Sequence, residues 1–138
     1  MTWAEHAIGR LADAGLRRGG ARSAVIALLD RQPCALTAQE VEGALGGGAS
    51  RASVYRVLDE LVEHGLASRI EVGQGVARYE PVRRDGHHHH LVCEACGAVR
   101  PFHDEELERA IGRAAGRVAF DVAEHDITLR GRCGDCSR

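Results

Sequence analysis

Apolar residues recur at helical spacing in four successive segments of the first half of the chain. Within each segment they lie three or four positions apart, which is the period of a helix with one face turned towards a core. The segments are residues 3–14, residues 21–31, a stretch that runs to about Leu45, and a stretch that opens at Ser50 or at Ala52-Ser53 and stops at Gly65. The pattern therefore predicts four consecutive helices.

The third and fourth helices carry the clearest local signals. Thr37 and Glu40 form a capping box, in which the Thr37 hydroxyl accepts a first-turn amide proton and Glu40 reaches back to the amide of Thr37. In the fourth helix the apolar face is made by five residues: Val54, Val57, Leu58, Leu61 and Val62. Ser53, Tyr55 and Arg56 fall off this face, so they are predicted to point away from the core.

The period changes after Gly65. Residues 66–72 and 76–82 have the composition of strands and flank a Gly73-Gln74-Gly75 turn, which predicts a hairpin. Helices followed by a two-stranded wing are typical of a winged helix-turn-helix domain, whose recognition helix enters the major groove of DNA. The hydroxyls and the guanidinium on the fourth helix suit phosphate and base contacts. They also suit an ordinary polar helix surface, since many helical hairpins bind no DNA.

The chain is predicted to be an α+β protein with two small domains. Its 138 residues, 44% of them apolar, are enough for packed cores. Residues 81–86 are short, charged and end in glycine, as a hinge does. They separate a DNA-binding domain over residues 1–80 from a second domain over residues 87–138.

The second domain is predicted to combine strands with one helix. Its first two strands are the segment that ends at Cys93 and residues 98–102. Asp104 can cap the helix that follows. Three apolar residues lie on the predicted core side of that helix: Leu107, Ile111 and Ala114. A last strand is predicted over residues 118–130, with a bulge or break near Ala123 because its apolar residues change parity there.

Two Cys-x-x-Cys pairs, Cys93 with Cys96 and Cys133 with Cys136, predict a metal site. Thiolate sulfur is a ligand that Zn²⁺ prefers, and two such pairs complete a closed tetrahedral site. The chain opens on no basic and apolar leader, and no apolar run approaches the roughly 18 residues of a membrane span. We therefore expect a cytoplasmic protein with no membrane segment, whose reduced cysteines bind metal rather than form disulfides.

Four consecutive histidines, His87 to His90, lead directly into the first cysteine pair. In a strand, successive side chains point to opposite faces. His87 and His89 are then expected to face one way and His88 and His90 the other, so that one tract can supply two metal sites. The alternative is a solvated polar strand in which only some imidazoles bind metal. His125 lies on an apolar, inward face of its predicted strand, where it is either a core histidine or a further ligand.

The net charge of −2 does not indicate a general nucleic-acid binder, but the basic residues are unevenly distributed. Arg17, Arg18 and Arg22 lie in an acid-free segment between Asp13 and Asp30. Phosphate binding requires a local positive face rather than a basic protein. Solvated surface arginines would produce the same pattern, so charge alone does not decide between the two.

In combination, these motifs resemble the ferric-uptake-regulator family of bacterial metal sensors. The resemblance rests on four pieces: residues 52–58, residues 87–96, Phe102 with Leu107-Glu108, and residues 125–136. It extends from about Gly15 to Cys136. It implies a winged-helix domain, a hinge and an α/β dimerisation domain in a homodimer. In such proteins metal binding sets two DNA-binding domains for an A·T-rich palindromic operator, usually to repress metal-uptake genes.

The resemblance also implies roles for individual residues. A structural zinc site is implied for Cys93, Cys96, Cys133 and Cys136. A regulatory hinge site for Zn²⁺ or Fe²⁺ is implied for Glu80, His88 and His90. A second site inside the dimerisation domain is implied for His87, His89, Glu108 and His125. Contacts with double-stranded DNA are implied for Arg22, Tyr55 and Arg56, and Ser53 joins them from its position on the fourth helix.

The chain departs from the family pattern where many members carry a histidine before the third helix. That position is Ala35 here, preceded by Cys34, which is either a replacement ligand that favours zinc or a small buried residue. Glu80 and Val82 stand where zinc sensors often carry a cysteine, which favours iron. His89 stands where some iron sensors carry aspartate, which favours zinc. The metal stays open, and peroxide sensing, which needs the missing histidine, is the alternative within the family.

Two functions of another class fit parts of the sequence. A zinc enzyme would use the histidines and Glu108, but a catalytic zinc needs an open position and a general base, and no His-Glu-x-x-His is present. A thiol oxidoreductase would place its Cys-x-x-Cys at the start of a helix, whereas Cys93 ends a predicted strand. We therefore expect a metal-dependent transcriptional repressor and not an enzyme.

Overall fold

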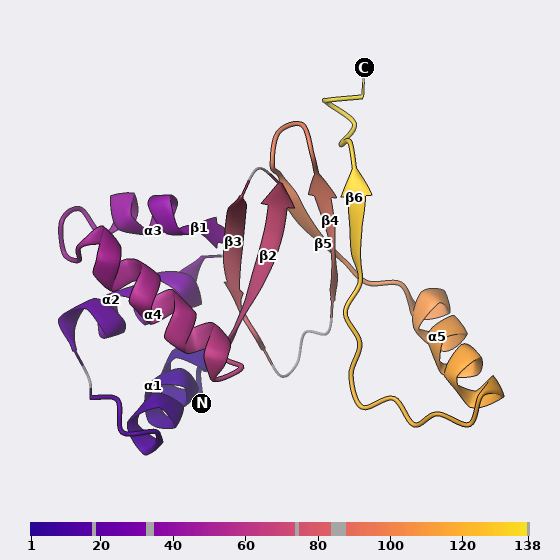
Figure 1. Ribbon diagram of the computed structural model, residues 1–138, viewed down its shortest axis with the longest axis horizontal. Helices are drawn as coiled ribbons and strands as arrows, with labels where there is room; N and C mark the ends of the chain where they lie inside the picture. Colours follow the sequence, from indigo (N-terminus) through magenta and orange to yellow (C-terminus); the bar gives the residue numbers. More distant parts are fainter. Residues whose placement is uncertain (18, 33–34, 74, 84–87, 138) are drawn as a thin grey trace. The chain divides into compact units, whose positions relative to one another are not determined.

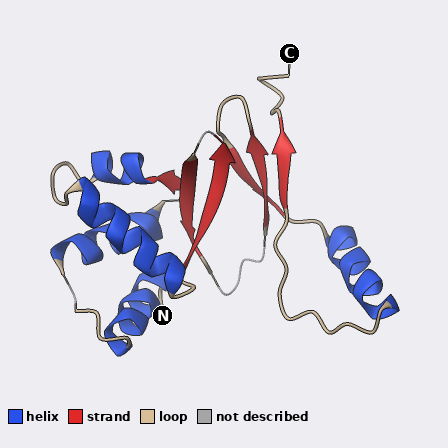
Figure 2. Cartoon of the chain, viewed as in Figure 1, coloured by secondary structure: helices blue, strands red, loops and turns tan. Residues whose placement is uncertain are grey.

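The computed structural model describes residues 1–17, 19–32, 35–73, 75–83 and 88–137. The chain divides into two compact units, Met1–Arg84 and Asp85–Arg138. Helices and two three-stranded sheets make up these units (Figures 1 and 2), so the predicted α+β class is confirmed. In the described part of the chain, no helix has both the length and the apolar character needed to cross a membrane.

The first unit has the predicted helices and hairpin. Its elements are α1 (Trp3–Asp13), α2 (Gly20–Arg31), β1 (Leu36–Thr37), α3 (Ala38–Ala44), α4 (Arg51–Glu63), β2 (Ala67–Gly73) and β3 (Val76–Pro81). The strands pair antiparallel in the order β1-β3-β2. Strand β1 was not predicted, because two residues carry no periodicity and its formation depends on pairing with Tyr79 and Arg78 of β3.

The core of this unit lies between the helices and the start of the hairpin. The predicted apolar face of α4 is buried except at its last member, since Val54, Val57, Leu58 and Leu61 are at most 1% exposed and Val62 is half-buried. Burying a side chain of this size stabilises the fold by about 1.5–3 kcal/mol. Trp3 links α1 to the hairpin, because its indole N–H donates to the carbonyl of Leu66 over 2.9 Å.

The predicted capping box begins α3. The amide of Glu40 donates to Thr37 Oγ1 and the amide of Thr37 donates to Glu40 Oε1, each over 3.0 Å. Glu40 Oε1 also accepts a hydrogen bond from Arg78 Nη1 over 2.8 Å. The cap therefore connects α3 to β3 as well as beginning the helix.

Replacing Thr37 with alanine is expected to lower the free energy of unfolding by about 1 kcal/mol, because one first-turn amide of α3 loses its acceptor. Urea denaturation monitored by circular dichroism measures this change. Thr37→Ser is the matched control, since it keeps the hydroxyl and should unfold close to the wild-type midpoint. Equal losses in the two variants would show that the methyl group, not the cap, stabilises this turn.

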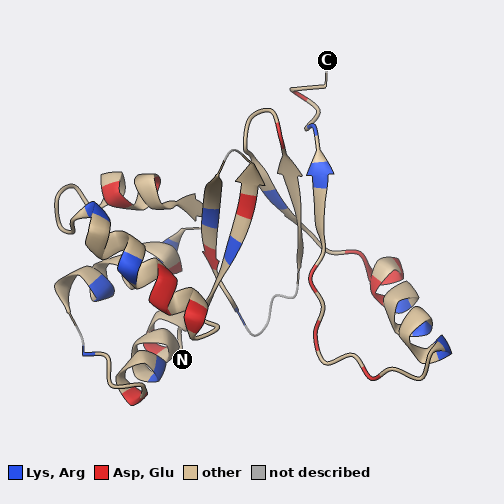
Figure 3. Cartoon of the chain, in the orientation of Figure 1, with Lys and Arg blue, Asp and Glu red and all other residues tan. Residues whose placement is uncertain are grey.

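The second unit contains β4 (His89–Cys93), β5 (Val99–Phe102), α5 (Glu105–Arg117) and β6 (Thr128–Gly131). Strand β4 lies in the centre, antiparallel to β5 and parallel to β6. Asp104 caps α5 as predicted, since its Oδ1 accepts from the amide of Leu107 over 3.0 Å. Acidic residues occupy the first turn of α5 and arginines follow towards its end (Figure 3), which suits the helix dipole.

The prediction of a strand over residues 118–130 is wrong for most of its length. Only Thr128–Gly131 is a strand, and residues 118–120 close α5 instead. Ala119 has a left-handed φ of 53° and its amide donates to the carbonyl of Gly116. The amide of Phe120 reaches back to the carbonyl of Ala115 over 3.0 Å. These two bonds form the helix-ending motif that satisfies the last carbonyls, and alternation of apolar residues does not reveal it.

The predicted core side of α5 is only partly covered. Leu107 and Ile111 are half-buried, whereas Ala114 is exposed, so its assignment to the core is wrong. All residues of α5 are described and none of them is buried. The helical period identifies which residues share a face, but packing against other elements decides how much of that face is covered.

Candidate metal centres and nucleic-acid interface

The two Cys-x-x-Cys pairs come together in the second unit. Cys93 ends β4, and a turn with Gly97 at a φ of 75° follows it. The second pair follows β6, which runs parallel to β4 and so delivers Cys133 to the same end of the sheet. The four Sγ atoms lie within 4.8 Å of one another.

The spacing of the sulfur atoms suits zinc. A tetrahedral zinc with bonds of about 2.3 Å places its sulfur ligands about 3.8 Å apart. The Sγ atoms of Cys96 and Cys133 are separated by 3.9 Å. The Sγ of Cys93 also accepts from the amides of Cys133 and Cys96, at 3.4 and 3.5 Å. Such amide bonds to a ligand sulfur stabilise its thiolate form.

The thiols of this cluster differ in acidity. The backbone amides of Cys133 and Cys96 lower the pKa of Cys93 to about 6. Hydrogen bonds to the neighbouring sulfurs, first that of Cys133, raise the pKa of Cys136 to about 12. The thiolate form of Cys93 is thus favoured at neutral pH. The thiolate form of Cys136 is disfavoured, because negative charge would accumulate among adjacent sulfurs. A bound dication supplies the compensating charge that lets all four act as ligands.

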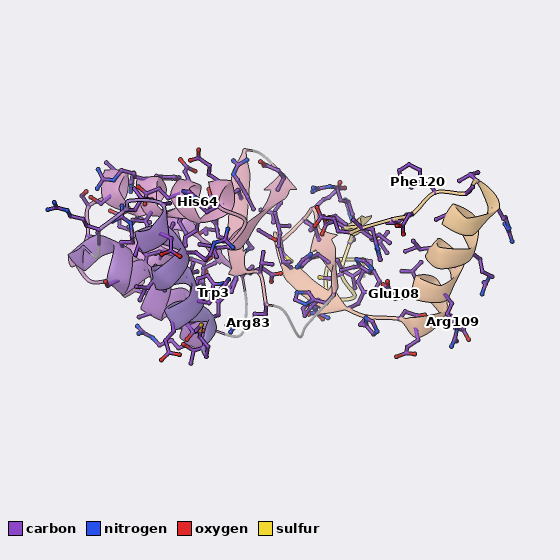
Figure 4. The ribbon with its side chains drawn as sticks, turned by 90° about the horizontal axis from the view of Figure 1, so that it is seen from below. Trp3, His64, Arg83, Glu108, Arg109 and Phe120 are labelled. Carbon is purple, nitrogen blue, oxygen red and sulfur yellow. The ribbon has the colours of Figure 1, made fainter. Side chains whose placement is uncertain are left out.

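A second group of donors joins β4 to α5 and the segment before β6. His89 is 1% exposed, and its Nε2 lies 2.6 Å from Glu108 Oε1. His125 Nε2 lies 2.7 Å from Glu108 Oε2. Glu108 projects from α5 towards the strands of its unit (Figure 4), so its carboxylate connects the two imidazoles. Three residues that are far apart in the sequence thus form one compact polar cluster.

The hydrogen bonds of His89 determine what its ring can do. Its Nδ1 accepts from the backbone amide of Ile127 over 3.2 Å. A neutral imidazole that accepts at Nδ1 carries its proton on Nε2, and this proton points at Glu108. His89 is therefore satisfied without a metal. For Nε2 to become a metal ligand, its proton must leave and the Ile127 amide must give up its acceptor.

The regulatory-site histidines lie next to this cluster in sequence but belong to a different group. The rings of His88 and His90 meet edge to face, with centroids 4.9 Å apart, and both are half-buried. Their proposed partner Glu80 lies on β3 of the first unit. His87, Cys34 and residues 84–86 of the expected hinge lie outside the described residues.

The expected DNA contacts occupy the first two turns of α4. Ser50 caps the helix by accepting from the amide of Ser53 over 3.2 Å, and the two hydroxyls lie 3.0 Å apart. Ser53 is therefore half-buried and engaged in the cap. Tyr55 is 47% exposed, and Arg56 is exposed beside it. These two side chains are available to a ligand of the first unit.

Tyr55 lines a cavity of about 160 Å³ together with residues of the wing and of the start of α3. Gln39 of α3 and Arg69 of β2 line the same cavity, and Arg69 Nε donates to the hydroxyl of Tyr79 over 3.3 Å. Sequence patterns did not indicate these neighbours. The hairpin register, which pairs Arg69 with Tyr79, was the signal that could have located Arg69 on the wing.

Arg22, the remaining expected DNA contact, is held within the unit. Its Nε and Nη2 donate to the two carboxylate oxygens of Glu60, over 3.0 and 3.1 Å, and its Nη1 donates to the carbonyl of Arg17. The side chains of Arg22 and Glu60 are 17% and 16% exposed. The guanidinium is thus committed to a protein partner, and the sequence did not indicate Glu60 as that partner.

Comparison with known proteins identifies the group to which the chain belongs. The model of the ferric uptake regulator family matches residues 13–130. The chain belongs to this family. It is therefore a metal-responsive transcriptional regulator, and members of its family act as dimers that bind DNA.

Individual relatives agree with this assignment. The ferric uptake regulation protein of Neisseria gonorrhoeae is 32% identical over 133 residues, which cover 94% of this chain and 92% of the relative. The peroxide operon regulator of Bacillus subtilis strain 168 is 31% identical over 137 residues, or 97% of this chain and 93% of the relative.

Two solved structures show the same fold. The ferric uptake regulator of Helicobacter pylori, described as having three functional metal binding sites, matches with a TM-score of 0.85 and 25% identity, over 98% of this chain and 94% of that one. The Vibrio cholerae regulator matches with a TM-score of 0.77 and 31% identity, over 89% and 96% of the two chains. The predicted resemblance to this family is confirmed.

Proposed function

We propose that this protein represses metal-uptake genes by binding an A·T-rich palindromic operator as a homodimer when its regulatory metal is bound. Residues 1–80 bind DNA, residues 81–86 act as the hinge and residues 87–138 form the dimerisation domain. One combination of features carries the proposal: two sets of metal-ligand residues in the second unit, together with an exposed Tyr55-Arg56 pair on α4. Because its operators are chromosomal, the protein works in the cytoplasm.

The four cysteines are the structural zinc site in this proposal. Their soft sulfur donors, and the 3.9 Å between the Sγ atoms of Cys96 and Cys133, suit Zn²⁺ better than a hard cation. A closed site with four protein ligands leaves no open position for a substrate. Zinc there would hold β4 and β6 together, which is a structural and not a catalytic role.

Glu80, His88 and His90 form the regulatory site in this proposal, with Zn²⁺ or Fe²⁺ as its ion. Two imidazoles and one carboxylate suit either metal. Because Glu80 belongs to the first unit and the histidines to the second, a shared ion would couple the two units. Such coupling needs about 1–3 kcal/mol of preference for the DNA-competent arrangement, or roughly 5- to 150-fold in affinity.

His89, Glu108 and His125, with His87, are the second metal site in this proposal. Glu108 supplies its carboxylate, but both imidazoles must first free Nε2. His125 has to give up the Nε2 proton that Glu108 accepts, and His89 binds only when the Ile127 amide releases Nδ1. Filling this site therefore involves a local change in the segment before β6. Without the metal, the hydrogen-bonded cluster itself holds α5 against β4.

Arg56→Ala is expected to weaken operator binding at least fivefold, because a guanidinium that contacts a phosphate or a base edge contributes about 1 kcal/mol or more. Fluorescence anisotropy measures the affinity, and the zinc content of the variant should stay at the wild-type value. Arg10→Ala removes the same charge from the exposed surface of α1 and serves as the control. Equal operator affinities of the Arg56→Ala and Arg10→Ala variants would show that Arg56 is not part of the DNA interface.

The proposed function is tested by anisotropy with an A·T-rich palindrome and a scrambled duplex. Protein treated with a mild chelator, which leaves the structural zinc in place, is titrated separately with Zn²⁺ and, without oxygen, with Fe²⁺. Salt is held constant, because phosphate contacts make affinity strongly salt-dependent. Binding to the palindrome that one metal switches on supports the proposal and identifies the metal. The proposal is contradicted if operator binding does not depend on metal, or if the metal-loaded protein selects no fragment from genomic DNA.

The similarity to a peroxide operon regulator supports peroxide sensing as a second candidate. The same assay separates the two functions, since a peroxide sensor loaded with Fe²⁺ loses its operator after a brief exposure to low hydrogen peroxide. A protein that keeps the operator under this treatment is a metal-uptake regulator only.

A further inference from the structure

Arg22 and Glu60 form a two-point ion pair that joins the first turn of α2 to the third turn of α4. Both carboxylate oxygens of Glu60 are occupied, over 3.0 and 3.1 Å. Both side chains are more than four-fifths covered, so water competes little for either charge. The Arg17 carbonyl adds a third acceptor to the guanidinium. An arginine held by three acceptors on its own protein is poorly placed to contact DNA.

Glu60 lies four residues after Arg56 on α4, so the two side chains are neighbours on the surface of one helix. Basic residues occupy the first half of α4 and acidic residues its second half (Figure 3), and Asp59 and Glu60 are the first two of these acids. Among the described residues, none forms an ion pair with Arg56. Two carboxylates follow Arg56 at neighbouring positions of the helix: Asp59 is exposed to water, and Glu60 is bound to Arg22.

We propose that Arg22 is a positioning residue, which holds Glu60 away from Arg56 and so keeps the Arg56 guanidinium free for DNA. The inference rests on the proposed function, since it assumes that Arg56 contacts the operator. Without Arg22, Glu60 would be a largely covered carboxylate with no partner, an unfavourable state that drives it towards the nearest cation. Arg56, four residues before Glu60 on α4, is a cation on the neighbouring turn of the same helix.

The alternative is that Arg22 contacts a DNA phosphate directly, as the family resemblance implies. The two roles differ in how they depend on Glu60. A direct contact is lost whenever Arg22 is lost, whatever stands at position 60. A positioning role disappears once the carboxylate is removed, because there is then no acid to keep away from Arg56.

The test is a double-mutant cycle with Arg22→Gln, Glu60→Gln and the double variant, in metal-loaded full-length protein with the palindrome. We expect Arg22→Gln to weaken operator binding about five- to tenfold, because Glu60 then forms an ion pair with Arg56. In the Glu60→Gln background the same change at Arg22 should alter affinity less than about twofold. Arg10→Gln, on exposed α1, controls for the loss of one positive charge.

A merely structural link between α2 and α4 would not behave in this way. Glu60→Gln alone would break such a link as completely as Arg22→Gln does, and would weaken DNA binding equally. Under our proposal, Glu60→Gln binds DNA at least as well as the wild type. Thermal unfolding of each variant is recorded alongside. If Arg22→Gln does not fold, the double variant is used instead, since it leaves no carboxylate unpaired. Its operator affinity is compared with that of Glu60→Gln, and this comparison alone distinguishes a positioning role from a direct DNA contact.

A five- to tenfold loss that persists in the Glu60→Gln background overturns the proposal and assigns Arg22 to the DNA contact. An equal loss in Glu60→Gln alone also overturns it and leaves a structural link. The wild-type titration is recorded first. If the wild-type protein shows no metal-dependent DNA binding, both the proposed function and the role of Arg22 are wrong. If the wild type binds as expected and only the variants depart from prediction, the role of Arg22 alone is wrong.

Discussion

Cys93→Ser is expected to remove the structural zinc and unfold the second unit, while the helices of the first unit stay folded. Structural zinc sites contribute roughly 10–16 kcal/mol of apparent binding free energy at neutral pH. That is as large as the whole folding free energy of a typical domain, about 5–15 kcal/mol. Within a single chain the second unit has few other sources of stability, since α5 has no buried residue and β6 is exposed.

Cys93 is the most informative of the four cysteines to replace. It is 4% exposed, ends the central strand and accepts two backbone amide bonds. Serine preserves the size of the side chain but supplies a hydroxyl, which is a poor ligand for zinc at neutral pH. Zinc content by mass spectrometry, hydrogen exchange in β4 and β6, and sedimentation velocity measure metal, fold and dimer separately.

Cys34→Ser makes the same chemical change in the first unit and serves as the matched control. It is expected to keep the structural zinc, the dimer and the exchange protection of β4. The assignment would be wrong if Cys93→Ser retained a full equivalent of tightly bound zinc and remained dimeric.

His90→Ala is expected to abolish the stimulation of DNA binding by metal, a loss of about 10- to 100-fold in operator affinity at saturating metal. The variant should remain a folded dimer with its structural zinc, because His90 is not among the four cysteine ligands. The physical reason is that a site reduced from three ligands to two no longer distinguishes the DNA-competent arrangement from the others.

The control for His90→Ala is His103→Ala. His103 is an exposed histidine before α5, and among the described residues it belongs to none of the groups that could hold a metal. Its removal should leave the metal response unchanged. Full stimulation in both variants would exclude His90 from the regulatory site, while loss in both would indicate a general effect of removing histidine.

The sequence by itself determined the features that depend on neighbours along the chain. The helical faces of α1 to α4, the Thr37-Glu40 cap, the hairpin after Gly65 and the Asp104 cap all follow from local periodicity and local hydrogen bonds. The two Cys-x-x-Cys pairs predicted a metal site for a similar reason, because the spacing within each pair already suits one ion.

Only the tertiary structure decided which distant groups meet. The parallel pairing of β6 with β4 brings Cys133 to Cys93, and the hydrogen bond from the Ile127 amide selects the tautomer of His89. Glu60 meets Arg22 because α2 and α4 pack against each other, although from the sequence each residue has the pattern of a solvated surface charge. Such pairings depend on packing between elements, and no local pattern in the chain encodes a partner tens of residues away.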